Sequence, residues 1–395
     1  MADSEPTFPR PPAGGPSALP DREGADDVEL PTFARTLLEG VRAGRRSALA
    51  RAISLVENEG PGFQALLHHL LRERPPSAAR VGITGPPGAG KSSLVTEFAR
   101  LCRRGGEDVG VVAVDPTSPY SGGALLGDRI RMNELATDPG IFIRSMASRG
   151  SLGGLATTTK EVIDLMDAYG FPRLLIETVG VGQTELEITG AADTVVVVLV
   201  PESGDGVQAM KAGLMEIADI FVVNKADRPG ADRLVREIRG ALKLRVGGMP
   251  AGAGHHGPAS TRTPGALEVR KGEGNGTGDT HPEVDPKRWV PRVLLTTAQT
   301  GEGVEELIEV VEEHRAHMEA TGELERRRRD RMLARVRDVM DREAKREVRR
   351  LLAPGTTTDA MLDRIQSGSA TPYSEAARVL AARRTKADRS TESGS

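Results

Sequence analysis

A glycine-rich octapeptide constrains this chain more than any other feature of the sequence. It reads Gly85-Pro-Pro-Gly-Ala-Gly-Lys91-Ser92 and lies between a short apolar run at Val81–Thr84 and a helical pattern at Ser92–Arg103. Its spacing and its place between strand and helix fit the pattern G-x-x-x-x-G-K-[ST]. Glycines let successive backbone N–H groups curve around phosphate oxygens, and a helix N-terminus adds partial positive charge. The octapeptide therefore predicts a nucleoside triphosphate site without selecting the base.

The residues of this loop have separate tasks in the predicted site. Lys91 would reach the β- and γ-phosphates, and Ser92 would ligate Mg²⁺. We expect the nucleotide to be held by the whole loop and the start of the helix, namely Gly85, Pro86, Pro87, Gly88, Ala89, Gly90, Lys91, Ser92 and Ser93.

A second motif, Asn224-Lys225-Ala-Asp227, favours guanine as the base. It follows an apolar strand at Ile220–Val223. A carboxylate can accept hydrogen bonds from N1–H and N2–H₂ of guanine, and adenine lacks that exocyclic donor. Asp227 would read the base, Asn224 would tie loops together and the Lys225 stem would lie along the ring. After the next strand, the backbone of Thr297, Ala298 and Gln299 is placed to donate to guanine O6.

Two carboxylates at strand ends are candidates for the metal. Asp115 ends the second predicted strand, and Glu177 ends the fourth. A carboxylate followed three residues later by glycine suits a γ-phosphate sensor, because the carboxylate holds Mg²⁺ and the glycine N–H contacts phosphate. We therefore expect Ser92, Asp115 and Glu177 to surround Mg²⁺, and Gly180 to contact the γ-phosphate.

Hydrolysis of GTP requires charge stabilisation and a positioned water molecule. Asp128, within Gly127-Asp-Arg129, is the candidate for positioning that water. It could also cap the helix that follows, and the two roles are compatible. The predicted catalytic residues are Lys91, Asp128 and Glu177. No arginine is evident as a catalytic finger, so we expect slow intrinsic turnover.

Short apolar runs alternate with helical patterns along the centre of the chain. The predicted strands are 81–84, 109–114, 141–146, 174–177, 195–200, 220–224 and 293–297, with helices at 92–103, about 156–169 and from 304 onward. Such alternation predicts an α/β fold with a mainly parallel sheet covered on both faces. Ligands of such sheets bind at the carboxyl ends of the strands, where the motifs above fall.

The flanking regions differ from this core in composition. We expect a disordered tail at 1–30, a helical region at 31–76, a GTPase domain at 77–318 and a second helical region at 319–385, before a short disordered tail at 386–395. A Gly- and Pro-rich insertion at 246–288 interrupts the GTPase domain. Residues Met332, Val336, Val339 and Met340 form an apolar stripe suited to packing or self-association.

Composition excludes several classes of protein. The 53 basic and 56 acidic residues are nearly balanced, which argues against a dedicated nucleic-acid binder. The single cysteine, Cys102, cannot form an internal disulfide and is expected to be a small buried hydrophobe. No apolar run reaches the ~18 residues of a membrane span, so we expect a cytoplasmic protein. The run Arg326–Arg329 is interpreted as a solvated helix face.

Taken together, the motifs resemble those of the MeaB/ArgK family of P-loop GTPases, which are chaperones of adenosylcobalamin-dependent mutases. The similarity runs from about Gly44 to Ala382, apart from the insertion. Its most specific parts are Arg46–Glu57, Gly85–Ser93, Val114–Ser118, Gly122–Met132, Glu177–Gln183 and Asn224–Asp227. Glutamate at 177, where Ras-type proteins carry aspartate, is typical of this family.

The resemblance implies a SIMIBI-type P-loop G domain in a homodimer that uses GTP, GDP and Mg²⁺. It also makes the helical region at 319–385 the dimerisation region. It implies a B12-dependent acyl-CoA mutase as partner, with adenosylcobalamin reached only through that enzyme. GTP would gate cofactor loading and protect or reactivate the mutase. The resemblance also makes Asp115–Met132 and Glu177–Glu185 switch loops, and a loop at Gly204–Lys211 relays the nucleotide state, with Lys211 as its signalling lysine.

Three alternatives remain open from the sequence. A metallochaperone GTPase would need His or Cys ligands near the switch loops, and the sequence lacks them there. A kinase or ATPase associated with amino-acid transport would need a kinase catalytic loop, and Asn224–Asp227 argues against ATP. A scaffold with an inactive nucleotide site is at odds with intact Lys91, Ser92 and Glu177.

Overall fold

A computed structural model describes residues 30–115, 135, 137–147, 157–178, 187–201, 213–247 and 288–392. The side chains of 115, 244–247, 356 and 383–392 lie outside that description. The chain forms two compact units, 1–329 and 330–395, and each is considered by itself.

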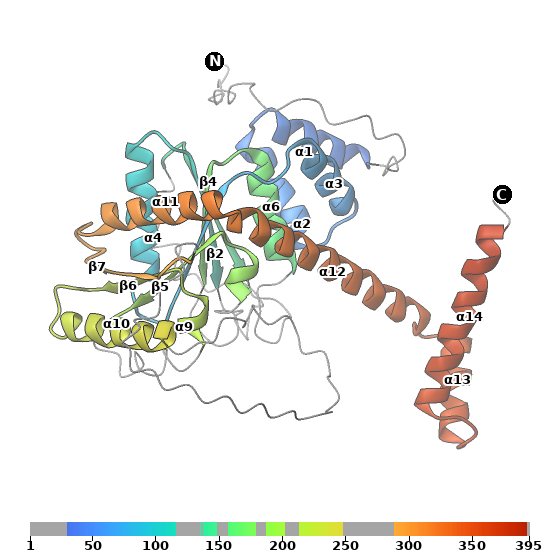
Figure 1. Cartoon of the computed structure of the whole chain (residues 1–395). Helices are drawn as coiled ribbons and strands as arrows, with labels where there is room; N and C mark the ends of the chain where they lie inside the picture. The colour runs from blue at the N-terminus through green and yellow to red at the C-terminus, as the bar shows by residue number, and fades with distance from the viewer. Residues whose placement is uncertain are drawn as a thin grey trace, which may run out of the picture. The chain divides into compact units, whose positions relative to one another are not determined.

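Seven strands form one sheet at the centre of the first unit (Figure 1), in the order β3-β2-β4-β1-β5-β6-β7. All six strand pairs are parallel. The strands are β1 Ala79–Thr84, β2 Val109–Asp115, β3 Ile141–Ala147, β4 Arg173–Thr178, β5 Thr194–Leu199, β6 Ile220–Asn224 and β7 Arg292–Thr296. The predicted parallel α/β sheet is confirmed, and every strand lies within a few residues of its expected place.

Helices cover both faces of this sheet. On one face, α4 (Lys91–Arg104) and α11 (Val304–Thr321) pack against apolar side chains such as Ile83 and Val198. On the other, α6 (Thr157–Tyr169) and α10 (Ala231–Gly247) pack against residues such as Ile176. The short elements η1 (Ile188–Gly190) and α9 (Leu214–Ile217) complete the unit. Strands buried on both faces explain why they read as continuous apolar runs.

Three N-terminal helices extend the second face: α1 (Thr32–Arg42), α2 (Arg46–Glu57) and α3 (Phe63–Glu73). Their buried leucines, valines and alanines join the same core cluster as α6. Arg46 fixes this bundle to the sheet by donating to the carbonyl oxygens of Asp138 and Pro139, at 3.3 and 2.7 Å. The three helices lie within the predicted region 31–76, and their core is continuous with that of the sheet.

Buried ion pairs gather at the amino ends of the central strands. Arg80 donates to Asp164 at 2.9 Å and to Asp167 at 2.8 Å. Asp193 and Asp219 precede β5 and β6, and both are buried. The guanidinium of Arg327 donates to both carboxylate oxygens of Asp219, at 3.0 and 2.9 Å.

The neighbouring Arg328 binds Asp193 at 3.0 Å and the carbonyl of Ala78 at 3.0 Å. The interpretation of Arg326–Arg329 as a solvated face is therefore wrong for Arg327 and Arg328, whose side chains are 30% and 23% exposed. Their carboxylate partners come from distant strand ends, so local charge alternation gave no sign of the pairing.

His314 of α11 is fully buried beside this network. Its Nδ1 lies 2.9 Å from the hydroxyl of Thr194, and its Nε2 lies 3.4 Å from Asp219. The ring packs against that of Trp289 at a tilt of 54°, with centroids 4.8 Å apart. Desolvation is the main cause that lowers the pKa of His314 to about 4, although Asp219 acts in the opposite direction. His314 is therefore neutral near pH 7.

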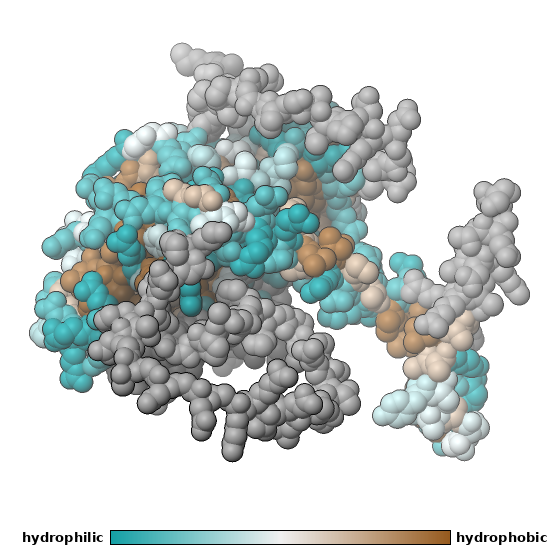
Figure 2. All heavy atoms as spheres, viewed as in Figure 1, coloured by the Kyte–Doolittle hydropathy of each residue, from teal (hydrophilic) through white to brown (hydrophobic). Residues whose placement is uncertain are grey.

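The helix α12 (Glu323–Leu351) begins in the first unit, and the second unit contains its later part with α13 (Thr356–Gln366) and α14 (Pro372–Glu392). Within that unit Glu375 is buried between Arg364 and Arg378, at 2.8 and 2.7 Å. Figure 2 shows apolar atoms among hydrophilic ones along this part of the chain. Its exposed large apolar side chains are Met332, Leu333, Val336, Met340, Val348, Leu351, Leu352, Leu362, Tyr373 and Leu380.

Candidate functional site

The glycine-rich loop joins β1 to α4 at the carboxyl edge of the sheet. Gly85, Gly88 and Gly90 have φ angles of 136, 75 and 85°, which favour glycine. A Cβ on Gly85 would lie 2.1 Å from the carbonyl oxygen of Val198 in β5. Close contact with β5 therefore requires glycine at the start of the loop, and the N-terminus of α4 is free of side-chain caps. A loop of this kind is suited to wrap phosphate groups.

Lys91 is buried at the first position of α4. Its ammonium group donates to the carbonyl oxygens of Gly85 and Pro86, at 2.8 and 3.0 Å. The side chain therefore folds back across the loop, where bound phosphate oxygens could replace these carbonyls as acceptors.

Ser92 and Glu177 lie together behind the loop. The Ser92 hydroxyl donates to a carboxylate oxygen of Glu177 at 2.7 Å, and both residues are buried. A hydroxyl and a carboxylate are hard oxygen ligands of the kind that Mg²⁺ takes together with water and substrate phosphates. The chemistry of this pair fits a magnesium ion. The backbone of Asp115 ends β2, which pairs with β4, and the side chain of Asp115 is not described.

Asn224 connects the phosphate loop to both predicted base motifs. Its amide nitrogen donates to the carbonyl of Ala89 at 2.9 Å. Its amide oxygen accepts from the Thr296 hydroxyl and the Ala298 N–H, each at 3.1 Å. A Cβ on Gly90 would lie 2.4 Å from this amide nitrogen, so the third glycine makes room for the clamp. Asn224 therefore links the phosphate loop to the turn that follows β7.

Lys225 and Asp227 occupy the turn after β6. The Lys225 ammonium donates to the Gly88 carbonyl at 2.9 Å, and its backbone adopts a φ of 56°. The turn is closed by a hydrogen bond from Arg228 N–H to the Lys225 carbonyl at 3.0 Å. Asp227 is exposed at this turn. Its carboxylate is therefore accessible to a base that lies along the Lys225 stem.

The turn at Thr297–Gln299 is structured by its own hydrogen bonds. Thr300 N–H donates to the Thr297 carbonyl at 3.0 Å, and Thr297 N–H donates to the Glu302 carbonyl at 3.0 Å. The Ala298 N–H is already donated to Asn224, whereas Gln299 is exposed. A guanine O6 that accepted from the Ala298 N–H would therefore have to displace its hydrogen bond to Asn224.

Three predicted residues lie outside the described part of the chain: Asp128, Gly180 and Lys211. Among the described residues, no group of three or more His, Cys, Asp or Glu is placed to hold a metal ion. Cys102 is 6% exposed, as expected of a buried hydrophobe. Across the described ranges, every helix is too short or too polar to traverse a bilayer.

Sequence reasoning missed a hydroxyl pair beside the site. Thr178 donates to Thr84 at 2.8 Å, and both threonines are fully buried. Each is the immediate neighbour of a motif residue, since Thr84 precedes Gly85 and Thr178 follows Glu177. That adjacency was the available signal, but only strand register reveals that the two hydroxyls meet.

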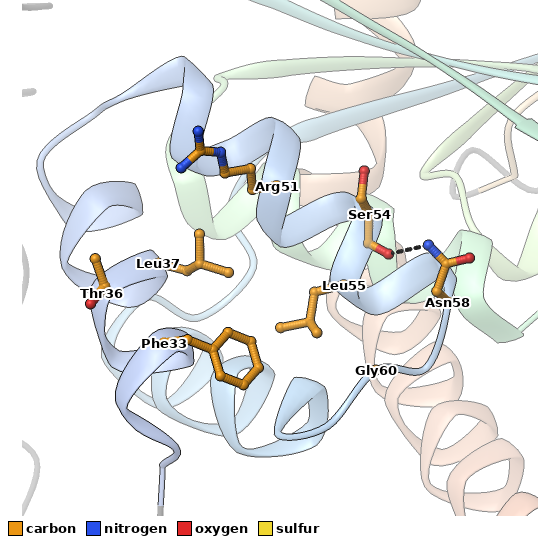
Figure 3. Close-up of a pocket in the computed structure, with 8 residues that line it drawn as sticks. All are labelled: Phe33, Thr36, Leu37, Arg51, Ser54, Leu55, Asn58 and Gly60. Carbon is orange, nitrogen blue, oxygen red and sulfur yellow. Dashed lines mark hydrogen bonds between the residues drawn. The ribbon is translucent and has the colours of Figure 1, made fainter.

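A hollow of about 590 Å³ lies elsewhere, between α1 and α2. Phe33, Leu37 and Leu55 point into it in Figure 3, and Arg51 stands at its rim. None of its lining residues belongs to the phosphate or base motifs. The hollow is therefore not part of the candidate nucleotide site.

Comparison with known proteins gives a consistent family. The family model described as methylmalonyl-CoA mutase-associated GTPase MeaB matches residues 49–351. A protein of Pyrococcus horikoshii named as a GTPase is 46% identical over 304 residues, covering 77% of this chain and 84% of its own length. The mouse mitochondrial methylmalonic aciduria type A homolog is 35% identical, covering 78% of this chain and 68% of its own.

A solved structure described as a LAO/AO transport system kinase aligns with a TM-score of 0.58 and 24% identity. It covers 91% of this chain and 100% of its own length, and at this identity it supports the fold alone. The α/β P-loop architecture, the intact phosphate and base motifs and the extent of the family match agree with one another. The chain belongs to the MeaB family of GTPases.

Proposed function

We propose that this GTPase serves as a chaperone of an adenosylcobalamin-dependent acyl-CoA mutase, gating cofactor loading and protecting or reactivating that enzyme. The observation that carries the proposal is the family match over residues 49–351, whose description names a mutase association. The name of the mouse relative refers to methylmalonic aciduria and points to the same metabolism. Methylmalonyl-CoA mutase or a related enzyme is therefore the proposed partner.

Within this proposal, GTP is held across the carboxyl edge of the sheet. The loop Gly85–Ser93 wraps the phosphates, with Gly180 at the γ-phosphate, while Asn224, Lys225 and Asp227 hold the base beside Thr297–Gln299. Ser92, Asp115 and Glu177 would hold Mg²⁺, which when bound neutralises charge on the phosphates. The support is the oxygen pair of Ser92 and Glu177 at 2.7 Å and the Asn224 clamp between loop and base motifs.

The chain's own residues would promote hydrolysis by position and charge. On GTP binding, Lys91 would leave the carbonyls of Gly85 and Pro86 for phosphate oxygens and stabilise the charge that develops there. Asp128 would orient the attacking water. Because no covalent step falls to the protein, turnover would depend on how well these groups are aligned.

The switch segments Asp115–Met132 and Glu177–Glu185 would carry the nucleotide state outward, and Lys211 would report it to the mutase. Two copies of the chain would associate through the second unit. What supports association is the exposed apolar set there, of which Met332, Val336 and Met340 are 53–65% exposed. Sedimentation of Met340→Glu should show a shift toward monomer, and unchanged dimers would contradict this part.

A nucleotide-dependent capture experiment tests the proposed partner. Tagged full-length protein is incubated with native extract in excess GTP analogue or GDP, and bound proteins are identified by mass spectrometry. A B12-dependent acyl-CoA mutase should be enriched, with a yield that differs between the two nucleotides.

The matched variants are Lys211→Ala and Lys243→Ala, since Lys243 is an exposed lysine of α10 outside every motif. Lys211→Ala should remove the nucleotide dependence, and Lys243→Ala should retain it. Absence of any such mutase in both nucleotide states would contradict the proposed function.

A further inference from the structure

The buried hydroxyl pair of Thr84 and Thr178 lies between two strands that each supply part of the site. Thr84 ends β1 and leads directly into the phosphate loop, whereas Thr178 ends β4 directly after Glu177. The two strands are parallel neighbours, with Ile83 opposite Glu177. One step further along this register brings the two threonines face to face, and their oxygens are 2.8 Å apart.

The pair lies on the opposite face of the sheet from the candidate magnesium ligands. Successive side chains of a strand alternate between faces, so Glu177 points toward Ser92 of α4 and Thr178 points the other way. On that other face the neighbouring Ile176 belongs to the core cluster that includes α6. The hydroxyls therefore cannot contact the nucleotide, and any effect on the reaction must act through the backbone.

Thr84 and Gly85 are held from both sides. On the β5 side, the approach of Gly85 to the Val198 carbonyl leaves no room even for a Cβ, which would lie 2.1 Å away. On the β4 side, the hydroxyl bond links Thr84 to the residue next to Glu177. The hydrogen bond between Thr178 and Thr84 therefore connects the loop that carries Lys91 to the strand that carries the Glu177 carboxylate.

A pair of valines at these two positions would fill the same space but would impose no preferred distance or angle between the two side chains. Threonine and valine have nearly the same shape, and β5 shows that valines suit this sheet, with four in succession from Val195 to Val198. A hydrogen bond between hydroxyls prefers a narrow range of distance and angle, whereas apolar contact does not. The two buried hydroxyls are therefore better explained by the need to fix β1 relative to β4 than by the need to fill space.

We propose that Thr84 and Thr178 are positioning residues that fix the position of Glu177 relative to the phosphate loop. They would thereby set the distance between the Ser92 and Glu177 oxygens that bind Mg²⁺. This role depends on the proposed function, because the magnesium site is part of it. The threonine pair would position the residues at the metal end of the site, whereas the hydrogen bonds of Asn224 position those at the base end.

The test separates position from stability through a double variant. Removing one hydroxyl leaves its partner buried without this bond, while replacing both by isosteric apolar groups can be nearly neutral for stability. Thr84→Val, Thr178→Val and the Thr84→Val/Thr178→Val double variant are compared with Thr178→Ser, which keeps the hydroxyl. Thr194→Val is the matched control, because Thr194 is a buried, hydrogen-bonded threonine at the other end of the sheet.

In the double variant, the melting temperature should stay within ~3 °C of the parent, and GDP affinity without Mg²⁺ should change less than about 2-fold. The Mg²⁺ concentration for half-maximal GTP hydrolysis should rise and kcat should fall, each about 5-fold or more, which corresponds to about 1 kcal/mol. Thr178→Ser should stay near the parent. Thr194→Val should lower the melting temperature and leave kcat and the Mg²⁺ requirement unchanged.

A double variant with parental kcat and Mg²⁺ requirement would overturn the positioning role. Glu177→Ala, measured in parallel, separates this failure from failure of the underlying site. A Glu177→Ala variant with impaired Mg²⁺ activation beside an unaffected double variant rejects the threonine role alone. A Glu177→Ala variant that needs no more Mg²⁺ than the parent rejects the magnesium site and the threonine role together.

Discussion

The two ends of the sheet are built from different chemistry. At the amino ends of the strands, charges meet charges: Arg80 lies between Asp164 and Asp167, and Arg327 grips Asp219 with two hydrogen bonds. At the carboxyl ends, Lys91 donates to backbone carbonyls, and the glycines of the loop leave backbone surface open. One end satisfies its charges within the fold, and the other offers groups whose contacts a ligand can exchange.

This difference assigns separate roles to buried charge in one domain. A buried ion pair contributes less to stability than its geometry suggests, but breaking it leaves an uncompensated charge at high cost. Such pairs suit the start of α12, because they fix this part of the helix in one position against the strand ends. The nucleotide end requires the reverse property, since its contacts must be exchanged in every cycle. Substitutions at the two ends should therefore separate stability from activity.

The largest effect is expected at Arg80. Replacing Arg80 by Leu leaves the carboxylates of Asp164 and Asp167 buried without their cation, which should lower the free energy of unfolding by about 3–5 kcal/mol. Urea denaturation measures the change, and activity per folded molecule should be retained. Arg233→Leu is the control, since Arg233 is 79% exposed and its pair should contribute less than ~1 kcal/mol. Equal losses in the two variants would contradict the distinction.

The converse effect is expected at Lys91. Lys91→Met keeps most of the side chain's volume but removes the charge that would stabilise phosphate oxygens. GTP hydrolysis should fall by about 10²–10³-fold, while the melting temperature should change by less than ~3 °C. Steady-state kinetics and thermal denaturation measure the two quantities. Hydrolysis near the parental rate would remove Lys91 from the mechanism, and a large loss of stability would show that the lysine has a structural role.

A pH effect of up to about 3 kcal/mol is expected from His314. The pKa of His314 is about 4 in the folded protein against its ordinary value of 6.5, mainly because the ring is desolvated. Between these values the unfolded chain binds more protons, so the free energy of unfolding falls as pH decreases from 6.5 to 4, by ~1.4 kcal/mol for each unit of pKa difference. His314→Gln should reduce this fall, as chemical denaturation across that pH range would show. An identical pH dependence in both proteins would refute the effect.

Most of the carboxyl end could be predicted from sequence, because its chemistry is local. Gly85–Ser92 and Asn224–Asp227 are contiguous motifs, and strands such as β5 are apolar throughout because both faces are covered. The amino end could not be predicted in the same way. Arg327 and Asp219 are far apart in sequence, and the arginine run that contains Arg327 gives no sign of this partner. Their meeting depends on how α12 docks, which is set by tertiary structure.

The same limit applies within the site itself. The contact between Ser92 and Glu177 was anticipated only as shared magnesium ligation, and the threonine pair behind it was missed because it depends on strand register. The N-terminal region was predicted as helical, but its division into three helices depends on turns at Gly44 and Gly62, whose φ angles are 72 and 78°. The local sequence pattern identifies the helices and strands, whereas tertiary packing determines the residues at which they end.

The central claim is that Asp227 reads a guanine ring while the loop at Lys91 holds its phosphates. Asp227→Asn tests it most directly, because an amide can donate to the 2-oxo group of xanthine but cannot accept both donors of guanine. Calorimetry should show GTP affinity falling by about 100-fold, or ~3 kcal/mol, with XTP binding more tightly to the variant than to the parent. Unchanged GTP affinity together with no gain for XTP would contradict the account.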